Sequence, residues 1–169
     1  MDKINESDVD WRKYDPEPDD TAFRRKELSS AVDADDLGCS LYELPPGMRS
    51  WPYHYHAANE EAIYVLAGEG LLRAAEGEES LAAGDFVTLP ADESGGHRVV
   101  NDSEEPLRYL VVSTMNEPDI TVYPEMETFG VYVGSPPGGR DERSLEGYYR
   151  LEDDVAYWQT EGELDEEVK

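Results

Sequence analysis

Residues 47–68 read GMRSWPYHYHAANEEAIYVLAG and contain two of the three histidines of the sequence. Within it His54 and His56 lie two positions apart, and alternate residues of a β-strand point to the same face. Glu61 follows a four-residue turn and opens the next apolar run, so a hairpin brings its carboxylate back beside the two imidazoles. Two imidazoles and one carboxylate at one place are donors typical of a transition-metal site.

A second stretch, GDFVTLPADESGGHRVVN at residues 84–101, carries the third and last histidine of the sequence. This residue, His97, arrives from a separate hairpin and supplies a third imidazole. The sequence therefore predicts one divalent ion, with Zn, Fe, Mn, Ni and Cu all compatible with these donors. The predicted ligands are His54, His56, Glu61 and His97. Four ligands on one face of a barrel leave coordination positions open, as a catalytic site requires.

The sequence around these stretches predicts many short strands separated by turns. The candidates are Cys39–Leu44, Trp51–His56, Glu61–Ala67, Gly70–Ala75, Glu79–Ala82, Phe86–Leu89, His97–Asn101 and Leu107–Thr114. Gly68, Gly77 and Gly84 tolerate the positive φ that tight hairpins need, and Pro90 cannot donate to a ladder. We find no segment of helical periodicity here. The pattern indicates an all-β antiparallel sandwich or barrel.

Composition changes along the chain predict three parts. Residues 1–21 are polar and acidic with two prolines, and we interpret them as an arm or disordered lead-in. Residues 22–134 form the predicted barrel, in which Ile120–Tyr123 and Val131–Val133 add edge strands. Residues 135–169 form an acidic, tyrosine-rich C-terminal extension that packs aromatic side chains on the outside of the barrel.

The two decisive stretches closely resemble the two motifs of the cupin superfamily. In the first motif a Gly precedes His-x-His, a Glu follows three or four residues later, and a Gly follows that Glu after six residues. Glu61 with Gly68 fits this spacing, whereas Glu60 does not. In the second motif Gly84, Pro90, His97 and Asn101 match, with a longer loop after the proline than the minimal form has. The resemblance implies a double-stranded β-helix, the jelly-roll or cupin barrel, with terminal extensions.

Strand alternation also suggests which residues surround the metal. Ile63 and Val65 share the face of Glu61, and Phe86 and Thr88 join them as apolar walls of the pocket. The cations Arg49, Arg73 and Arg98 are rare in so acidic a chain. Each either holds a substrate carboxylate or phosphate bidentately or makes a surface ion pair with a nearby acidic residue.

The charge balance is extreme, with 40 acidic residues against 14 basic ones and a net charge of −26. Such a charge opposes compaction at ordinary ionic strength, whereas at molar salt the Debye length falls to ~3 Å and the repulsion is screened. We therefore expect a halophilic protein. The alternative is an ordinary acidic protein whose acidic ends are flexible. We expect no direct nucleic-acid binding, because phosphate recognition needs clustered cations.

The expected location is the cytoplasm. There is one cysteine, the first residues lack the pattern of a signal peptide, and nothing approaches the ~20 apolar residues of a membrane span. We expect no membrane partner.

The resemblance implies several functions without choosing among them. Cupins with three His and one Glu include dioxygenases, oxalate-processing enzymes and sugar-phosphate isomerases, so a metal-dependent oxidoreductase or isomerase of a small oxygen-rich metabolite is the first hypothesis. No separate acid or base residue can be assigned. The alternatives are a non-catalytic small-molecule sensor and a barrel with a purely structural metal. The flanks are similar to single-domain bacterial and archaeal cupins that lack an assigned reaction, and the superfamily suggests a homodimer.

Overall fold

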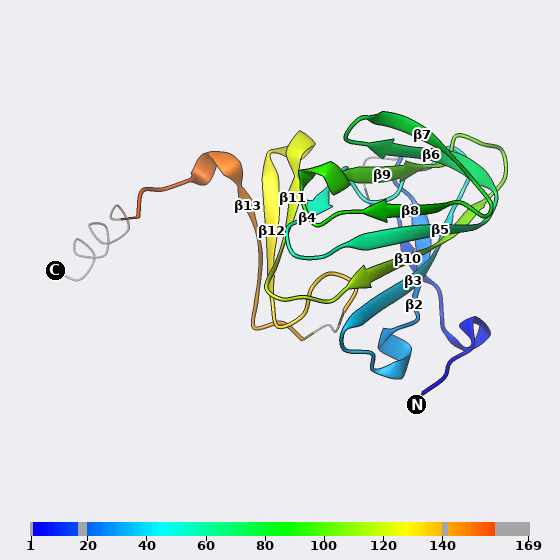
Figure 1. The fold of residues 1–169 in the computed structure, drawn as a ribbon, viewed down its shortest axis with the longest axis horizontal. Coiled ribbons are helices and arrows are strands. Elements are labelled where there is room, and N and C mark those ends of the chain that lie inside the picture. The colour runs from blue at the N-terminus through cyan, green and yellow to red at the C-terminus, as the bar shows by residue number, and fades with distance from the viewer. Residues whose placement is uncertain (1, 17–19, 140–141, 158–169) are drawn as a thin grey trace.

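The computed structural model describes residues 2–16, 20–139 and 142–157, and their regular structure is mostly β-strand (Figure 1). The strands are β1 (Arg12–Tyr14), β2 (Phe23–Glu27), β3 (Leu37–Leu44), β4 (Tyr55–His56), β5 (Glu61–Ala67), β6 (Glu69–Ala74), β7 (Gly77–Ala82), β8 (Phe86–Leu89), β9 (His97–Val100), β10 (Leu107–Thr114), β11 (Asp119–Tyr123), β12 (Thr128–Val133) and β13 (Leu145–Arg150). Short 3-10 turns are η1 (Glu6–Asp8), η2 (Ser30–Val32), η3 (Glu93–Gly95), η4 (Pro124–Met126) and η5 (Leu151–Asp153).

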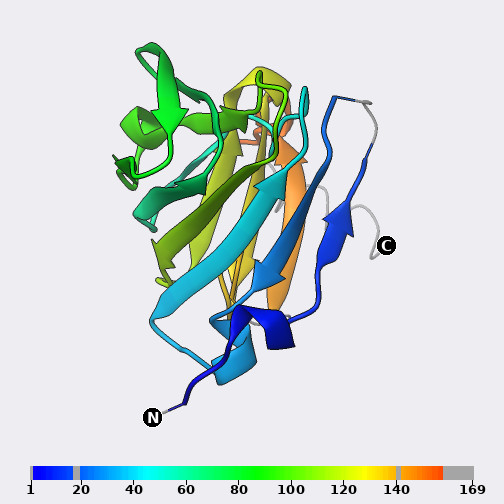
Figure 2. The same ribbon diagram turned by 90° about the vertical axis from the view of Figure 1, so that its right-hand side faces the viewer.

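The strands form three antiparallel sheets that wrap around a common interior (Figures 1 and 2). The largest has the order β1-β2-β3-β10-β5-β8, the second β13-β12-β11-β4 and the third β7-β6-β9. Neighbouring strands from distant parts of the sequence therefore meet, as β3, β10 and β5 do. The predicted all-β antiparallel barrel is confirmed.

Several predicted strands match the structure residue for residue, namely those of β5, β8 and β10. The strand expected at Trp51–His56 is shorter, because only Tyr55 and His56 pair as β4. Pro52 precedes them and has no N–H to donate to a ladder. His54 instead makes an isolated bridge with His97, whereas His56 pairs with Thr121 of β11. The two histidines thus hydrogen-bond to different sheets.

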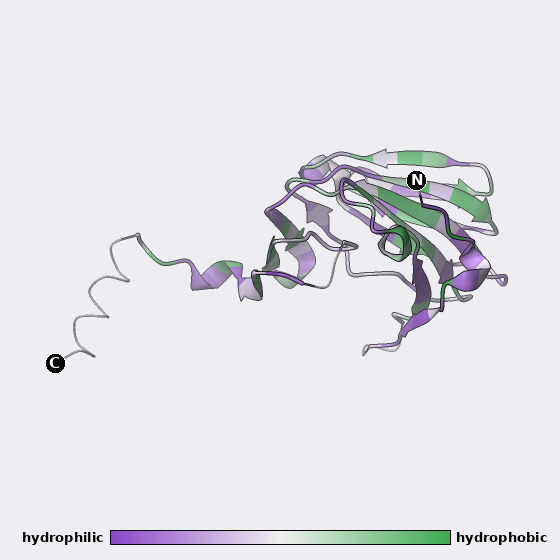
Figure 3. Ribbon diagram, turned by 90° about the horizontal axis from the view of Figure 1, so that it is seen from below, coloured by the Kyte–Doolittle hydropathy of each residue, from purple (hydrophilic) through white to green (hydrophobic). Residues whose placement is uncertain are grey.

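The hydrophobic core fills the barrel beneath the site. Its fully buried side chains include Leu44, Ile63, Val65, Leu107 and Tyr109. Hydrophobic residues accordingly concentrate on the barrel strands in Figure 3. Burial of each such side chain contributes about 1.5–3 kcal/mol relative to exposure.

The N-terminal segment is not wholly the arm expected at residues 1–21. Arg12–Tyr14 form β1, which pairs with β2 at the edge of the largest sheet. Tyr14 stacks on Phe23 with ring centroids 4.9 Å apart and meets Trp51 edge-on at 4.8 Å. These aromatic contacts explain why a polar segment joins the fold.

The C-terminal extension also joins a sheet. Strand β13 pairs with β12 along Leu145–Arg150. Residues 158–169 of the predicted extension lie outside the described part of the chain.

Candidate metal centre

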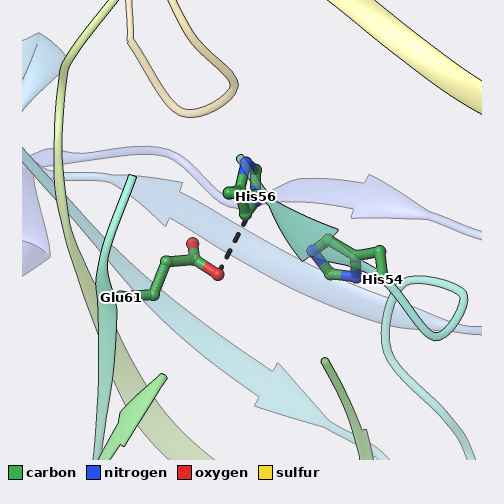
Figure 4. Close-up of side chains that lie close together, drawn as sticks. All are labelled: His54, His56 and Glu61. Atoms are coloured by element: carbon green, nitrogen blue, oxygen red, sulfur yellow. Dashed lines mark ion pairs between the residues drawn. The ribbon is translucent and has the colours of Figure 1, made fainter. Parts of the chain in front are cut away.

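Three strands and the isolated bridge just before β4 bring the predicted ligands together. His56 ends β4, Glu61 begins β5 and His97 begins β9, while His54 sits just before β4 at its bridge with His97. Figure 4 shows the Glu61 carboxylate directed at His56, with His54 beside them. The three imidazoles are buried, with exposures between 6% and 8%.

The distances suit a metal site. His54, His56 and Glu61 each offer a donor atom within 4.8 Å of the others. The Oε2 atom of Glu61 lies 3.7 Å from Nε2 of His56 and 3.5 Å from Nε2 of His97. The His97 ring centroid lies 4.7 Å from that of His54. The structure therefore brings all four predicted ligands together, with Glu61 facing two of the imidazoles.

Hydrogen bonds fix the ring nitrogens of all three histidines. Nδ1 of His54 lies 2.8 Å from the carbonyl oxygen of Pro52, and Nδ1 of His97 lies 3.0 Å from that of Gly95. Nδ1 of His56 lies 2.6 Å from the Asp119 carboxylate. Since these partners accept, each neutral ring carries its proton on Nδ1 and leaves an Nε2 lone pair for a metal. The donor set thus fits a divalent transition ion.

The electrostatics keep two of these rings neutral. Burial, reinforced by the neighbouring histidines, lowers the pKa of His54 well below its usual value. Burial also lowers the pKa of His97, although the Glu61 charge opposes it. Burial also lowers the pKa of His56, but the hydrogen bond to Asp119 and the negative charge of Glu61 outweigh this effect. The pKa of His56 is therefore raised above its usual value. His56 is therefore the ring that a proton occupies first.

Sequence reasoning missed Asp119, which supports His56. Its side chain is completely buried, and besides His56 it accepts a hydrogen bond from the Ala58 backbone N–H at 3.2 Å. It lies 63 positions from His56, so no local spacing could reveal the pair. Thr121 adds a hydroxyl 3.2 Å from the same Nδ1.

The site opens into a cavity of about 360 Å³. His54, His56 and Glu61 line one part of it. Aromatic side chains form much of the remaining wall, namely Tyr14, Tyr42, Trp51, Tyr123, Tyr132 and Tyr148. Among them, Trp51 donates from Nε1 to the Tyr42 hydroxyl at 3.1 Å. A cavity of this size accommodates a small metabolite.

The predicted apolar walls are in part wrong. Phe86 is 64% exposed and Thr88 is also exposed. The pairing of β5 with β8 sets Val87 opposite Ile63, so the pleat turns Phe86 and Thr88 to the outer face. Ile63 and Val65 do face inward, but they belong to the core and do not line the cavity.

The predicted anion contacts through Arg49, Arg73 and Arg98 are not supported, because none of these residues lines the cavity. Arg49 pairs with Asp20 at 2.8 Å, and Arg73 pairs with Glu125. Arg98 donates to the Thr21 hydroxyl at 2.8 Å. Arg49 and Arg73 therefore fit the alternative of surface ion pairs. The arginines that do line the cavity are Arg12, Arg25 and Arg143.

The barrel and the buried cluster of histidines and one carboxylate can now be compared with known proteins. Residues 40–113 match the family model described as a cupin domain. The chain therefore contains a cupin domain, and its fold is that of the cupin superfamily.

Solved structures extend the likeness to almost the whole chain. A candidate sugar phosphate isomerase from Acidithiobacillus ferrooxidans is 26% identical, with a TM-score of 0.73 over 89% of this chain and 90% of that one. A sugar phosphate isomerase of the cupin superfamily from Silicibacter pomeroyi is 23% identical, with a TM-score of 0.76 over 92% and 96%. A predicted oxalate decarboxylase from Thermotoga maritima is 21% identical, with a TM-score of 0.57 over 66% and 97%. The comparison with curated proteins gave no match.

In the part of the chain that the structure describes, no helix has the length and apolar character needed to cross a membrane. The homodimer and the cytoplasmic location expected from the sequence stay predictions.

Proposed function

We propose that this chain binds one divalent transition metal through His54, His56, Glu61 and His97 and uses it to act on a small oxygen-rich metabolite. The observation that carries the proposal is that all three Nδ1 atoms have acceptors, which leaves the three Nε2 atoms to a metal. The 26% identity to the candidate sugar phosphate isomerase supports the interconversion of an aldose and a ketose phosphate as the reaction.

The residues around the proposed metal have distinct tasks. A divalent ion held here supplies Lewis-acid polarisation of substrate oxygens. The backbone carbonyls of Pro52 and Gly95 and the Asp119 carboxylate hold the imidazoles in one orientation. Trp51 and Tyr42 form part of the cavity wall and are fixed by the hydrogen bond between them, which would hold that wall in place around a substrate.

Tyr123 is placed to assist the substrate. Its ring stacks on His54 with centroids 5.8 Å apart, and it lines the cavity. Burial raises the pKa of Tyr123 to about 12, so the phenol keeps its proton at neutral pH. It can therefore donate a hydrogen bond to a substrate oxygen, and interconversion of a hydroxyl and a carbonyl on adjacent carbons needs such a donor.

The test combines metal content with turnover. Full-length protein is loaded with each of the five metals in turn and mixed with a panel of aldose and ketose phosphates, and NMR follows interconversion. Glu61→Gln should lose both metal and turnover. Glu60→Gln is the matched control, because this exposed neighbour lies outside the donor cluster and should retain both.

The outcomes separate the hypotheses. A metal-loaded protein that binds members of the panel without converting any of them supports a sensor. Unfolding on chelation supports a structural metal. Full metal content in Glu61→Gln contradicts the proposal itself.

A further inference from the structure

The wall of the cavity carries arginines that the candidate metal centre does not use. Among the described residues that line it, three are arginines and three are carboxylates: Arg12, Arg25, Arg143, Glu27, Glu61 and Glu146. In the whole chain the ratio is 14 basic to 40 acidic residues, so the cavity is enriched in cations. Since Glu61 is proposed to bind the metal, the remaining lining carries more positive than negative groups.

Arg25 reaches the cavity from β2 and is firmly held. Its side chain is 10% exposed, and it pairs with Glu27, the carboxylate that Arg12 also approaches at 3.6 Å. A guanidinium Nη1 of Arg25 donates to the Tyr42 hydroxyl at 3.4 Å. A guanidinium in so enclosed a position attracts an anion more strongly than one in bulk water does, because the local dielectric is low.

Arg143 reaches the cavity from the loop before β13. Its Nε donates to the Ser135 carbonyl at 2.8 Å, and its Nη1 donates to Glu146 at 2.9 Å. The guanidinium also lies over the Tyr132 ring, 5.0 Å from its centroid. These contacts orient it before a ligand arrives, so little side-chain entropy is lost on binding.

We propose that Arg25 and Arg143 form an anion subsite in this cavity that binds the phosphate group of the substrate. The guanidinium fork matches the oxygens of a phosphate or a carboxylate, and phosphate is the choice that agrees with the proposed sugar phosphate reaction. The inference rests on the proposed function for this choice, but the arginines bind the anion without help from the metal. Both arginines lie outside residues 40–113, so the subsite is a property of the flanks.

The experiment is calorimetric titration of full-length protein with inorganic phosphate at constant ionic strength, before and after chelation of the metal. Wild-type protein should bind phosphate saturably in both states. Arg25→Lys and Arg143→Lys keep the charge but lose the fork, and each should weaken binding by about tenfold. Arg73→Lys is the matched control, because Arg73 pairs with Glu125 away from the cavity, and its affinity should be unchanged.

Three results would overturn the subsite: phosphate affinity equal to wild type in both lysine variants, an equal loss of affinity in Arg73→Lys, or no saturable binding of phosphate. Binding that disappears on chelation locates phosphate at the metal, which overturns the subsite and leaves the proposed function standing. Conversely, phosphate binding by Glu61→Gln with no turnover of sugar phosphates in the wild type keeps the subsite and contradicts the isomerase. An acetate titration as tight as the phosphate titration overturns the choice of phosphate.

Discussion

Two regions of the molecule contribute to the cavity in different ways. The region that matches the cupin family, residues 40–113, supplies all four candidate metal ligands. The flanks supply Arg12, Arg25 and Arg143, together with tyrosines from β12 and β13. The matched region, called the shared domain below, thus supplies the candidate metal ligands, whereas the flanks supply the arginines and several tyrosines of the cavity wall.

One residue of the flanks, Asp119, takes part in the candidate metal centre as well. Asp119 opens β11, outside the matched region, yet it holds the Nδ1 atom of His56. Strand β11 also pairs with β4 through Thr121 and His56. A flank therefore orients a candidate ligand of the shared domain.

The largest effect is expected when a ligand of the shared domain is removed. His97→Ala should lose more than about a hundredfold in metal affinity, because removing a direct ligand costs more than the 10–100-fold loss typical of its supporting partners. Elemental analysis after gel filtration measures the metal, and circular dichroism checks the β content. Tyr55→Phe on β4 is the control. Full metal content in His97→Ala would show that three ligands suffice.

The candidate metal centre could be predicted because the pattern that indicates it is local in the sequence. His54, His56 and Glu61 lie within eight positions of one another in the sequence, and strand alternation with one hairpin brings them together. Only His97 required a second motif. The prediction that Phe86 and Thr88 line the pocket was wrong. The register of β5 against β8 decides which face of β8 points inward, and this register does not follow from the sequence of β8 alone.

The flanks were poorly predicted for a different reason. Strand β2 reads Phe-Arg-Arg-Lys-Glu, which resembles a solvated charged segment, yet Arg25 and Lys26 are nearly buried. The Lys26 ammonium lies 4.8 Å from the centroid of the Trp11 ring, so long cationic side chains cover apolar surface here. The sequence could not say which arginines face the cavity, because that depends on pairings between distant strands.

The contact between Asp119 and His56 gives the next prediction. Asp119→Asn keeps the shape but weakens the acceptor for His56, so metal affinity should fall about 10–100-fold. Competition with a chromophoric chelator measures the loss. Thr121→Val removes the other side-chain group beside the same nitrogen and should cost less. Unchanged metal affinity in Asp119→Asn would contradict the inference that this flank orients His56.

The pH dependence of metal binding should follow His56. Its pKa is raised above the ordinary value of about 6.5, whereas those of His54 and His97 are lowered. As pH falls through the raised pKa, a proton occupies His56 first, and affinity should drop by up to about tenfold per pH unit. In Asp119→Asn the pKa of His56 decreases, so the drop should begin at lower pH. Chelator competition between pH 6 and 8.5 measures both curves, and identical onsets would contradict the assignment.

The smallest effect concerns whether the flanks and the shared domain unfold as one unit. The net charge of −26 is spread over both, so added KCl should screen repulsion in both and raise a single thermal midpoint. We expect a rise of about 2–4 °C, which corresponds to ~1 kcal/mol in a chain of this size. Far-ultraviolet circular dichroism and tryptophan fluorescence, followed from 0.1 to 1 M KCl, should give coincident curves.

Glu76→Lys combined with Glu79→Lys, on an exposed hairpin, should reduce the salt dependence of the thermal midpoint. A midpoint independent of KCl would contradict the halophilic hypothesis, whereas two separate transitions would show that β1, β2 and β13 are an independent layer on the barrel.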